Sequence, residues 1–127
     1  MKIISVSIDE ETEREIDSIM KEIGATGRSE TVRNGIKMLG NETQMLKNLQ
    51  EKASGILVVI HKSGAESMVS IIKHKYEDVI STQIHNNLKD GKCLEVFILN
   101  GSGERIKNMV KEFMSKKKIS YTKLIVT

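Results

Sequence analysis

An isolated alternating segment near the start of this 127-residue chain constrains its fold more than any other feature. Residues 2–8 place Ile4, Val6 and Ile8 on one face and mostly polar residues on the other. This period of two predicts a half-buried strand. The next forty residues contain no second strand-like segment, and strands are not stable without partners. We therefore expect the segment to pair with its copy in a second chain, as an antiparallel two-stranded ribbon.

Two helices are predicted to follow the ribbon strand. Asp9 is a suitable N-cap, and the apolar residues after it recur at helical spacing, which predicts a helix over 10–23. Ser29 is expected to cap a second helix that runs to about Leu39, and Gly40-Asn41 is expected to end it.

A dimeric ribbon flanked by helices fits the DNA major groove. Together with the segment Gly27-Arg-Ser-Glu-Thr-Val-Arg33, this β-α-α pattern resembles the ribbon-helix-helix family of DNA-binding proteins. Residues 1–40 carry six basic and eight acidic side chains, so DNA binding there would depend on local geometry rather than on a general positive charge. The resemblance implies that the outward ribbon side chains Ile3, Ser5 and Ser7 contact the bases. It also implies that the start of the second helix, around Arg28 and Ser29, holds a DNA phosphate.

The hydrophobic pattern changes after a polar stretch over 41–53. Strand-like segments occur at 56–60, 79–86, 93–99 and 119–126, and helical ones at 63–76 and 101–117. The order strand-helix-strand-strand-helix-strand is that of a ferredoxin-like domain. We therefore predict an α+β protein with a ribbon-helix-helix domain over 1–45, a linker over 46–54 and a ferredoxin-like domain over 55–127.

Alternation along the two central strands groups their side chains by face. One group is expected to look toward the helices: Ile80, Ile84, Leu88, Leu94, Val96 and Ile98. The other group would lie on the helix-free face: Ser81, Gln83, His85, Asn87, Cys93, Glu95 and Phe97. A two-residue turn at Asp90-Gly91 would put the thiol on the core side. We favour an odd-numbered loop, which sets His85 opposite Cys93.

Imidazole and thiolate are the ligands that borderline-to-soft divalent metals prefer. His74 is predicted on a helix whose Met68, Ile72 and Tyr76 pack on the other side of the sheet, so it would have to reach such a site from a neighbouring subunit. The remaining histidine, His61, is left without a role. The alternative interpretation is a pair of surface histidines and a buried, inert cysteine.

The spacing His74, then His85-x-Asn87-x5-Cys93, resembles the His, His-x-His-x5-Cys pattern of NikR-type nickel-responsive transcriptional repressors. The resemblance covers nearly the whole chain, including Cys93-Leu-Glu-Val and Asn100-Gly101. It implies an ACT-like second domain and a homotetramer, a dimer of dimers, with square-planar Ni(II) between subunits. The implied ligands are His85 and Cys93 from one subunit and His74 from another, and Glu95 would support them by hydrogen bonding.

The sequence departs from that pattern at several positions. Asn87 stands where the family has its middle histidine, and an amide oxygen is a weak, neutral ligand. Three interpretations are open: nickel with Asn87 or water in the fourth position, Cu(II) or Zn(II) instead, or a different effector. A second cation site in the family is matched by Glu30 but not by Asn34, and a DNA-contacting basic pair is matched by Lys62 but not by Ser63.

These patterns predict a metal-responsive repressor that binds a double-stranded DNA operator with inverted half-sites. The alternative is an ACT-like regulator that responds to a small molecule. A third reading, an antitoxin-like protein, leaves the second domain unexplained. The sequence shows neither a Ser/His/Asp constellation nor a pair of acids suited to catalysis, so we do not expect an enzyme. With one cysteine, no apolar leader and no run of about 20 apolar residues, the chain is expected to be cytoplasmic, without membrane contact.

Overall fold

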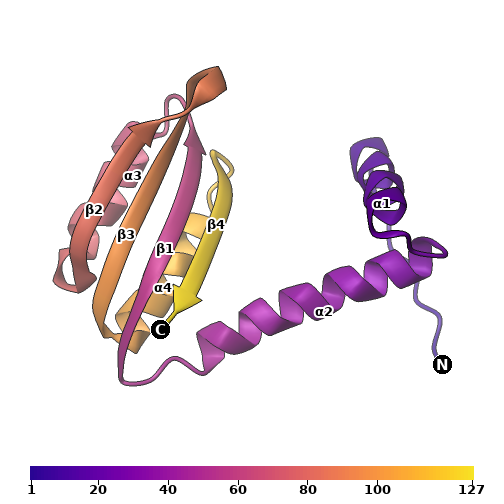
Figure 1. Ribbon diagram of the computed structural model, residues 1–127, viewed down its shortest axis with the longest axis horizontal. Coiled ribbons are helices and arrows are strands. Elements are labelled where there is room, and N and C mark those ends of the chain that lie inside the picture. The colour runs from indigo at the N-terminus through magenta and orange to yellow at the C-terminus, as the bar shows by residue number, and fades with distance from the viewer. The chain divides into compact units, whose positions relative to one another are not determined.

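The computed structural model describes residues 1–127, which divide into two compact units, Met1–Gln44 and Met45–Thr127. The first unit contains helix α1 (Glu10–Ile23) and most of helix α2 (Arg28–Lys47) (Figure 1). As predicted, Asp9 caps α1: its side chain accepts a hydrogen bond from the Thr12 N–H at 2.7 Å. Helix α1 ends at Gly24, whose φ of 66° is readily adopted only by glycine.

Helix α2 begins at Arg28, so the prediction that Ser29 caps it is wrong. The helix continues through Gly40 to Lys47, so its predicted end at Gly40-Asn41 is wrong as well. A glycine inside a helix costs only about 1 kcal/mol relative to alanine. Beyond that glycine, Leu46 and Leu49 pack against the hydrophobic core of the second unit. This packing outweighs the local preference to end the helix.

The first unit leaves its apolar side chains exposed. Residues 2–8 form no strand within the single chain, and Ile4 and Val6 are 79% and 73% exposed. Helix α1 buries no residue, and Ile36 on α2 is 62% exposed. A strand that pairs with its own copy has no partner in one chain, so the predicted ribbon stays a prediction.

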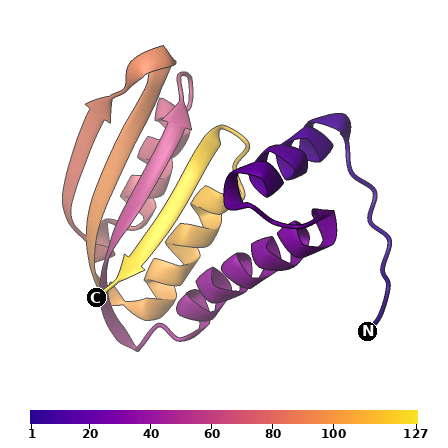
Figure 2. The ribbon, with the colours of Figure 1, turned by 45° about the vertical axis from the view of Figure 1, so that its right-hand side comes forward.

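The second unit is a four-stranded antiparallel sheet with both helices on one face (Figure 2). Its strands, in the spatial order β2-β3-β1-β4, are β1 (Lys52–Lys62), β2 (Ile80–Asn87), β3 (Lys92–Ser102) and β4 (Ile119–Val126). The helices are α3 (Glu66–Lys75) and α4 (Gly103–Met114). Short 3₁₀ turns, η1 (Glu77–Val79) and η2 (Lys89–Gly91), flank β2. The predicted α+β class and ferredoxin-like order of elements are confirmed.

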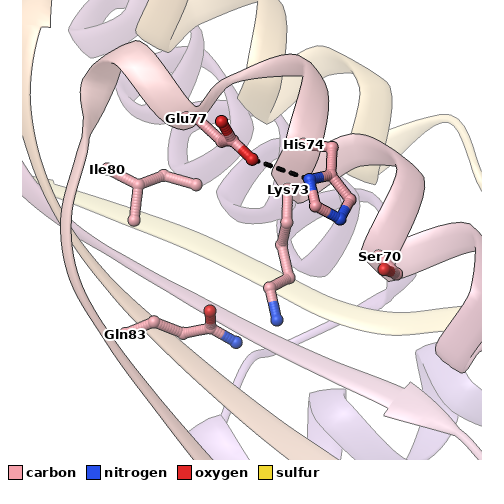
Figure 3. Close-up of a pocket in the computed structure, with 6 residues that line it drawn as sticks. All are labelled: Ser70, Lys73, His74, Glu77, Ile80 and Gln83. Atoms are coloured by element: carbon pink, nitrogen blue, oxygen red, sulfur yellow. Dashed lines mark hydrogen bonds and ion pairs between the residues drawn. The ribbon is translucent and has the colours of Figure 1, made fainter.

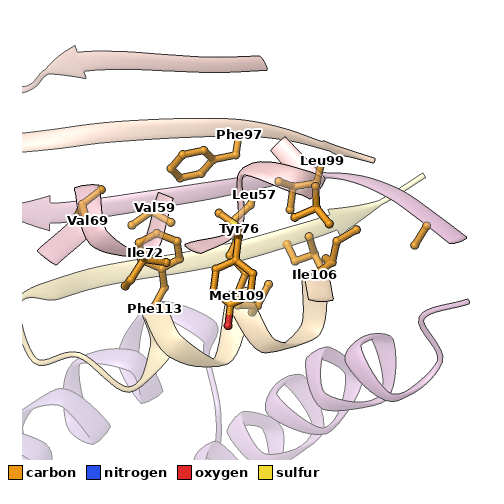
Figure 4. Close-up of a cluster of buried hydrophobic side chains, with 14 residues drawn as sticks. Leu57, Val59, Val69, Ile72, Tyr76, Phe97, Leu99, Ile106, Met109 and Phe113 are labelled. Carbon is orange, nitrogen blue, oxygen red and sulfur yellow. The ribbon is translucent and has the colours of Figure 1, made fainter. Parts of the chain in front are cut away.

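The hydrophobic core lies between the sheet and its helices (Figure 4). Leu57 from β1, Phe97 from β3 and Phe113 from α4 are fully buried, and the two phenylalanine rings stack with centroids 5.9 Å apart. Tyr76, just after α3, and Met109 on α4 complete the packing of the two helices on this face.

The predicted assignment of the two sheet faces is wrong. Phe97 is in the core, and the β3 residues that share its face are also buried: Cys93, Glu95 and Leu99. The residues predicted to face the helices, Leu94, Val96 and Ile98, lie on the helix-free face. Alternation shows which residues share a face, but it cannot show which face the helices cover when both are apolar.

Strand β2 contains an irregularity that the sequence pattern did not reveal. Its register against β3 shifts between Ile80 and Thr82. Ile80 therefore packs against the core as predicted, whereas Ile84 is 55% exposed on the helix-free face. Leu88, also predicted to face the helices, lies after the end of β2 and is 38% exposed.

The helix-free face of the sheet is largely apolar. The pairing register puts these side chains together on it: Ile56, Val58, Ile60, Ile84, Leu94, Val96, Ile98, Tyr121 and Ile125. Several of them are substantially exposed, including Ile98 at 43% and Ile125 at 49%. A contiguous apolar surface of this kind is characteristic of an interaction site.

A polar network joins α3 to α4. The Arg105 guanidinium lies over the Tyr76 ring, 4.5 Å from its centroid, and donates to the Lys75 carbonyl at 2.6 Å and to Asp78 Oδ1 at 2.7 Å. Tyr76 donates its hydroxyl to Glu112 at 3.1 Å, and Lys75 pairs with the same carboxylate. These hydrogen bonds, first that of Lys75, lower the pKa of Glu112.

We predict that Glu112→Gln destabilises the second unit by about 1 kcal/mol at pH 7, because a partly exposed hydrogen bond between charged groups contributes about this much. Because the pKa of Glu112 is lower in the folded state, its contribution is fully present above the unfolded value of about 4.3 and is lost progressively as pH falls from there through the folded-state pKa. Urea unfolding at pH 7 and pH 3.5 measures the difference, with Glu104→Gln as control. A destabilisation that is equal at both pH values would contradict this account.

Candidate metal centre at the end of the central strands

Polar side chains from three adjacent strands gather near one end of the sheet, on the face that carries the helices. The register aligns Asn87 of β2, Cys93 of β3 and His61 of β1 in one row. His85 and Glu95 stand opposite each other in the next row. Because directly opposed residues have Cβ atoms about 4.5–5.5 Å apart, Cys93 lies between Asn87 and His61 and within reach of both.

This arrangement corrects two predictions about the site. His85, Asn87 and Cys93 share a face, but it is the helix-covered face and not the helix-free one. The residue opposite Cys93 is Asn87, not His85. The connection between them includes the turn η2, in which Asp90 and Gly91 both adopt left-handed backbone angles, with φ of 63° and 70°. This turn fixes the register two residues away from the predicted one.

The side chains in the two rows differ in exposure and partners. The Cys93 thiol is buried and donates to Asn87 Oδ1 at 3.5 Å. Glu95, expected to support metal ligands, is also buried and accepts a hydrogen bond from the Gln83 amide at 3.0 Å. His85 is exposed on the edge strand β2. The site therefore has a buried part on β3 and an open part on β2.

His61 is a member of this group that sequence reasoning missed. Its side chain is 1% exposed. Its Nδ1 lies 3.2 Å from the Lys62 carbonyl, and its Nε2 has no hydrogen-bond partner and lies 3.6 Å from Glu95 Oε1. The sequence offers one signal for it, the alternation of His61 with Leu57 and Val59, which puts all three on one face of β1. Its position opposite Cys93 follows only from the pairing of β1 with β3.

His74 lies on the same side of the sheet as these residues, so the prediction that its helix packs on the opposite side is wrong. It is exposed on the last turn of α3, and its Nδ1 is 2.7 Å from Glu77 Oε1 (Figure 3). It lines an open pocket of about 440 Å³ with Ser70, Lys73, Glu77, Ile80 and Gln83. Gln83 joins this pocket to the polar rows, because it also binds Glu95.

The single chain does not bring the predicted ligands to one point. No three of its His, Cys, Asp or Glu side chains converge as a metal would require. Completing a set that includes His74 therefore needs a second chain or a change of side-chain conformation.

The residues predicted to contact DNA or a second cation are placed as follows. Arg28 pairs with Asp17 at 2.8 Å and with Glu13 at 3.3 Å, which links α2 to α1. Glu30 accepts from the backbone N–H and the hydroxyl of Thr26 at 2.8 and 2.7 Å, and these bonds, first that of the hydroxyl, lower the pKa of Glu30. Asn34 is half-buried on α2. Arg28 is exposed, as are Ile3, Ser5, Ser7, Ser29 and Lys62.

Comparison with protein families identifies the second unit. Residues 54–127 match the family model described as the NikR C terminal nickel binding domain. A protein of Methanococcoides burtonii named "Putative nickel-responsive regulator" is 33% identical over 95% of this chain and 89% of its own length. A protein of Methanocaldococcus jannaschii with the same name is 30% identical over 99% of this chain and 92% of its own length.

The chain therefore belongs to the NikR family of nickel-responsive regulators. Since its relatives are regulators, the prediction that it is not an enzyme is confirmed. None of its helices is long and apolar enough to cross a bilayer.

Solved structures confirm the fold of the second unit. An uncharacterized protein of Thermotoga maritima, TM1266, superimposes with a TM-score of 0.56 at 14% identity, over 60% of this chain and 98% of its own. The C-terminal domain of the MgtC protein of Mycobacterium tuberculosis gives 0.51 at 12% identity, over 61% and 90%. At these identities the likeness concerns the fold alone.

Proposed function

We propose that this nickel-responsive regulator is a cytoplasmic DNA-binding repressor whose metal sits between subunits. The observation that carries the proposal is the position of the Cys93 thiol beside the imidazole-bearing edge strand, with His74 exposed on the same side of the sheet. In this proposal His85 and Cys93 come from one subunit and His74 comes from another.

The donor set suits a first-row transition metal. Two imidazoles and a thiolate fit Ni(II), and they also suit Cu(II) and Zn(II). Asn87 departs from the family pattern, which has a histidine at this position. Its amide oxygen accepts the thiol hydrogen of Cys93 at 3.5 Å. Bound metal would displace this proton and join two subunits, which is what a sensor needs in order to change an assembly. Nickel remains the preferred ion because the family is nickel-responsive.

The apolar surfaces support a homotetramer that is a dimer of dimers. The helix-free sheet face, with Ile84, Ile98 and Ile125 exposed, would pair with the same face of a second copy. In the first unit, a ribbon made from two copies of residues 2–8 would cover the exposed apolar side chains of Ile4 and Val6. Two different self-complementary contacts per chain close a tetramer.

DNA binding is assigned to a ribbon-helix-helix domain over 1–45, joined by residues 46–54 to the metal-binding and tetramerisation domain over 55–127. Ile3, Ser5 and Ser7 would face the bases of an operator with inverted half-sites. Ser29 at the start of α2 would hold a phosphate, and Lys62 would contact DNA from the second domain. Metal would act by favouring the tetramer conformation that fits the operator.

A second candidate function is supported by the pocket beside His74. Its volume of about 440 Å³ and its polar side chains Lys73, His74, Glu77 and Gln83 suit a small organic ligand. Position 87 also lacks the imidazole of the family pattern. These two features favour, as the alternative function, an ACT-like regulator that responds to a small molecule.

We predict that reduced, metal-free protein titrated anaerobically with Ni(II) develops a saturating thiolate-to-metal absorption band at one ion per chain. The band should be lost in Cys93→Ala, because the thiolate is the source of the transition. Parallel titrations with Cu(II) and Zn(II) rank the ions. Fluorescence anisotropy of labelled DNA measures whether the loaded protein binds DNA more tightly. Failure of all three ions to bind would overturn the metal proposal and favour an organic ligand.

We further predict that Ile98→Lys separates the tetramer into smaller species, because a charge would be buried in the proposed sheet-to-sheet contact. Analytical ultracentrifugation gives the mass of the assembly. Met114→Lys, which also replaces an apolar residue by lysine but at an exposed position at the end of α4, should leave the mass unchanged. A tetramer that persists in Ile98→Lys would mean that the helix-free face is not the interface.

A further inference from the structure

We propose that His61 supplies the imidazole that Asn87 no longer provides, so that the metal in this chain is bound on the β1 side of Cys93. This inference rests on the proposed function, and it concerns which of the chain's own residues bind the metal.

The strand register supports this exchange. Asn87 and His61 stand directly opposite Cys93 on its two sides, in β2 and in β1. All three side chains point to the same face of the sheet. Both flanking positions are therefore direct neighbours of Cys93, at about 4.5–5.5 Å between Cβ atoms. An imidazole lost on one side is matched by an imidazole present on the other.

The hydrogen bonding of His61 leaves Nε2 ready to bind a cation. A carbonyl oxygen can only accept, so Nδ1 is the donor in the contact with Lys62 O at 3.2 Å. In a neutral imidazole the lone pair is then on Nε2. Metal-binding histidines are typically oriented in this way, by donating the other ring N–H to a backbone carbonyl or a carboxylate.

The surroundings of Nε2 also suit a positively charged ion. The atom is buried without a hydrogen-bond partner, and it faces Glu95 Oε1 at 3.6 Å. Two neighbouring ligand atoms that bind one ion at about 2.1 Å lie roughly 3.0 to 3.4 Å apart, from square-planar to tetrahedral geometry. The separation of Nε2 and Oε1 is thus close to that of two atoms that share a metal. Glu95 would change from a supporting residue to a ligand.

Cys93 joins this pair by rotation of its side chain. Its Sγ now lies against Asn87 Oδ1 at 3.5 Å, so that no three donors yet converge. A rotation about the Cα–Cβ bond would carry Sγ toward His61. On binding a metal, the thiol would give its proton to solvent. His85, opposite Glu95, and the His74 of a second subunit remain available to complete the coordination.

The test compares wild-type protein with His61→Gln, Asn87→His and the double variant, using Ni(II) as the probe. We expect His61→Gln to weaken nickel binding at least 10-fold and to change the thiolate absorption band. Adding Asn87→His should restore affinity, because it returns an imidazole to the other side of Cys93. Circular dichroism and sedimentation confirm that each variant is folded and assembled. Unchanged affinity and band in His61→Gln would overturn the proposal.

A measurement on the unmutated protein keeps the test independent of folding defects. Long-range ¹H–¹⁵N spectra of wild-type protein loaded with Zn(II) report the ring nitrogens of all three histidines. We expect the Nε2 resonance of His61 to shift as metal binds. If metal binds tightly and this resonance does not move, the inference fails while the proposed function stands. If wild-type protein binds no metal at all, both fail.

Discussion

The antiparallel register of β3 between β1 and β2 is the constraint on which the rest of this structure depends. It places Cys93 in the middle strand, with Asn87 on one side and His61 on the other. The same register sets Phe97, four pairs further along, into the core against Phe113. Core packing and site geometry are therefore parts of one pairing, because a shift by one residue would turn every side chain of β3 to the opposite face.

Hydrogen bonds from helix α4 anchor the C-terminal end of helix α3. Arg105 and Glu112 of α4 hold Lys75, Tyr76 and Asp78 around the end of α3, next to His74. His74 itself is exposed and paired only with Glu77 nearby. An anchored helix with an exposed histidine in its last turn is compatible with the proposed binding of metal across a subunit contact.

The order of elements in the second unit could be predicted from the sequence because each strand and helix carries its own periodicity and end signals. Three features could not. Gly40 does not end α2, because Leu46 and Leu49 pack on the distant core. The predicted assignment of the two sheet faces is reversed, because Ile84 and Ile98 make the helix-free face apolar as well. His61 was overlooked, because its proximity to Glu95 arises from pairing between strands far apart in the chain.

The central claim is that metal binds between subunits, and mixed assemblies test it most directly. Chains with His74→Ala are combined with chains carrying Cys93→Ala, and mixed tetramers are isolated with two different affinity tags. Neither variant should bind nickel tightly alone. If each site takes its ligands from two subunits, about one quarter to one third of the sites in the mixed tetramers should be restored. No recovery of binding in the mixed assemblies would contradict the account and place all ligands within one chain.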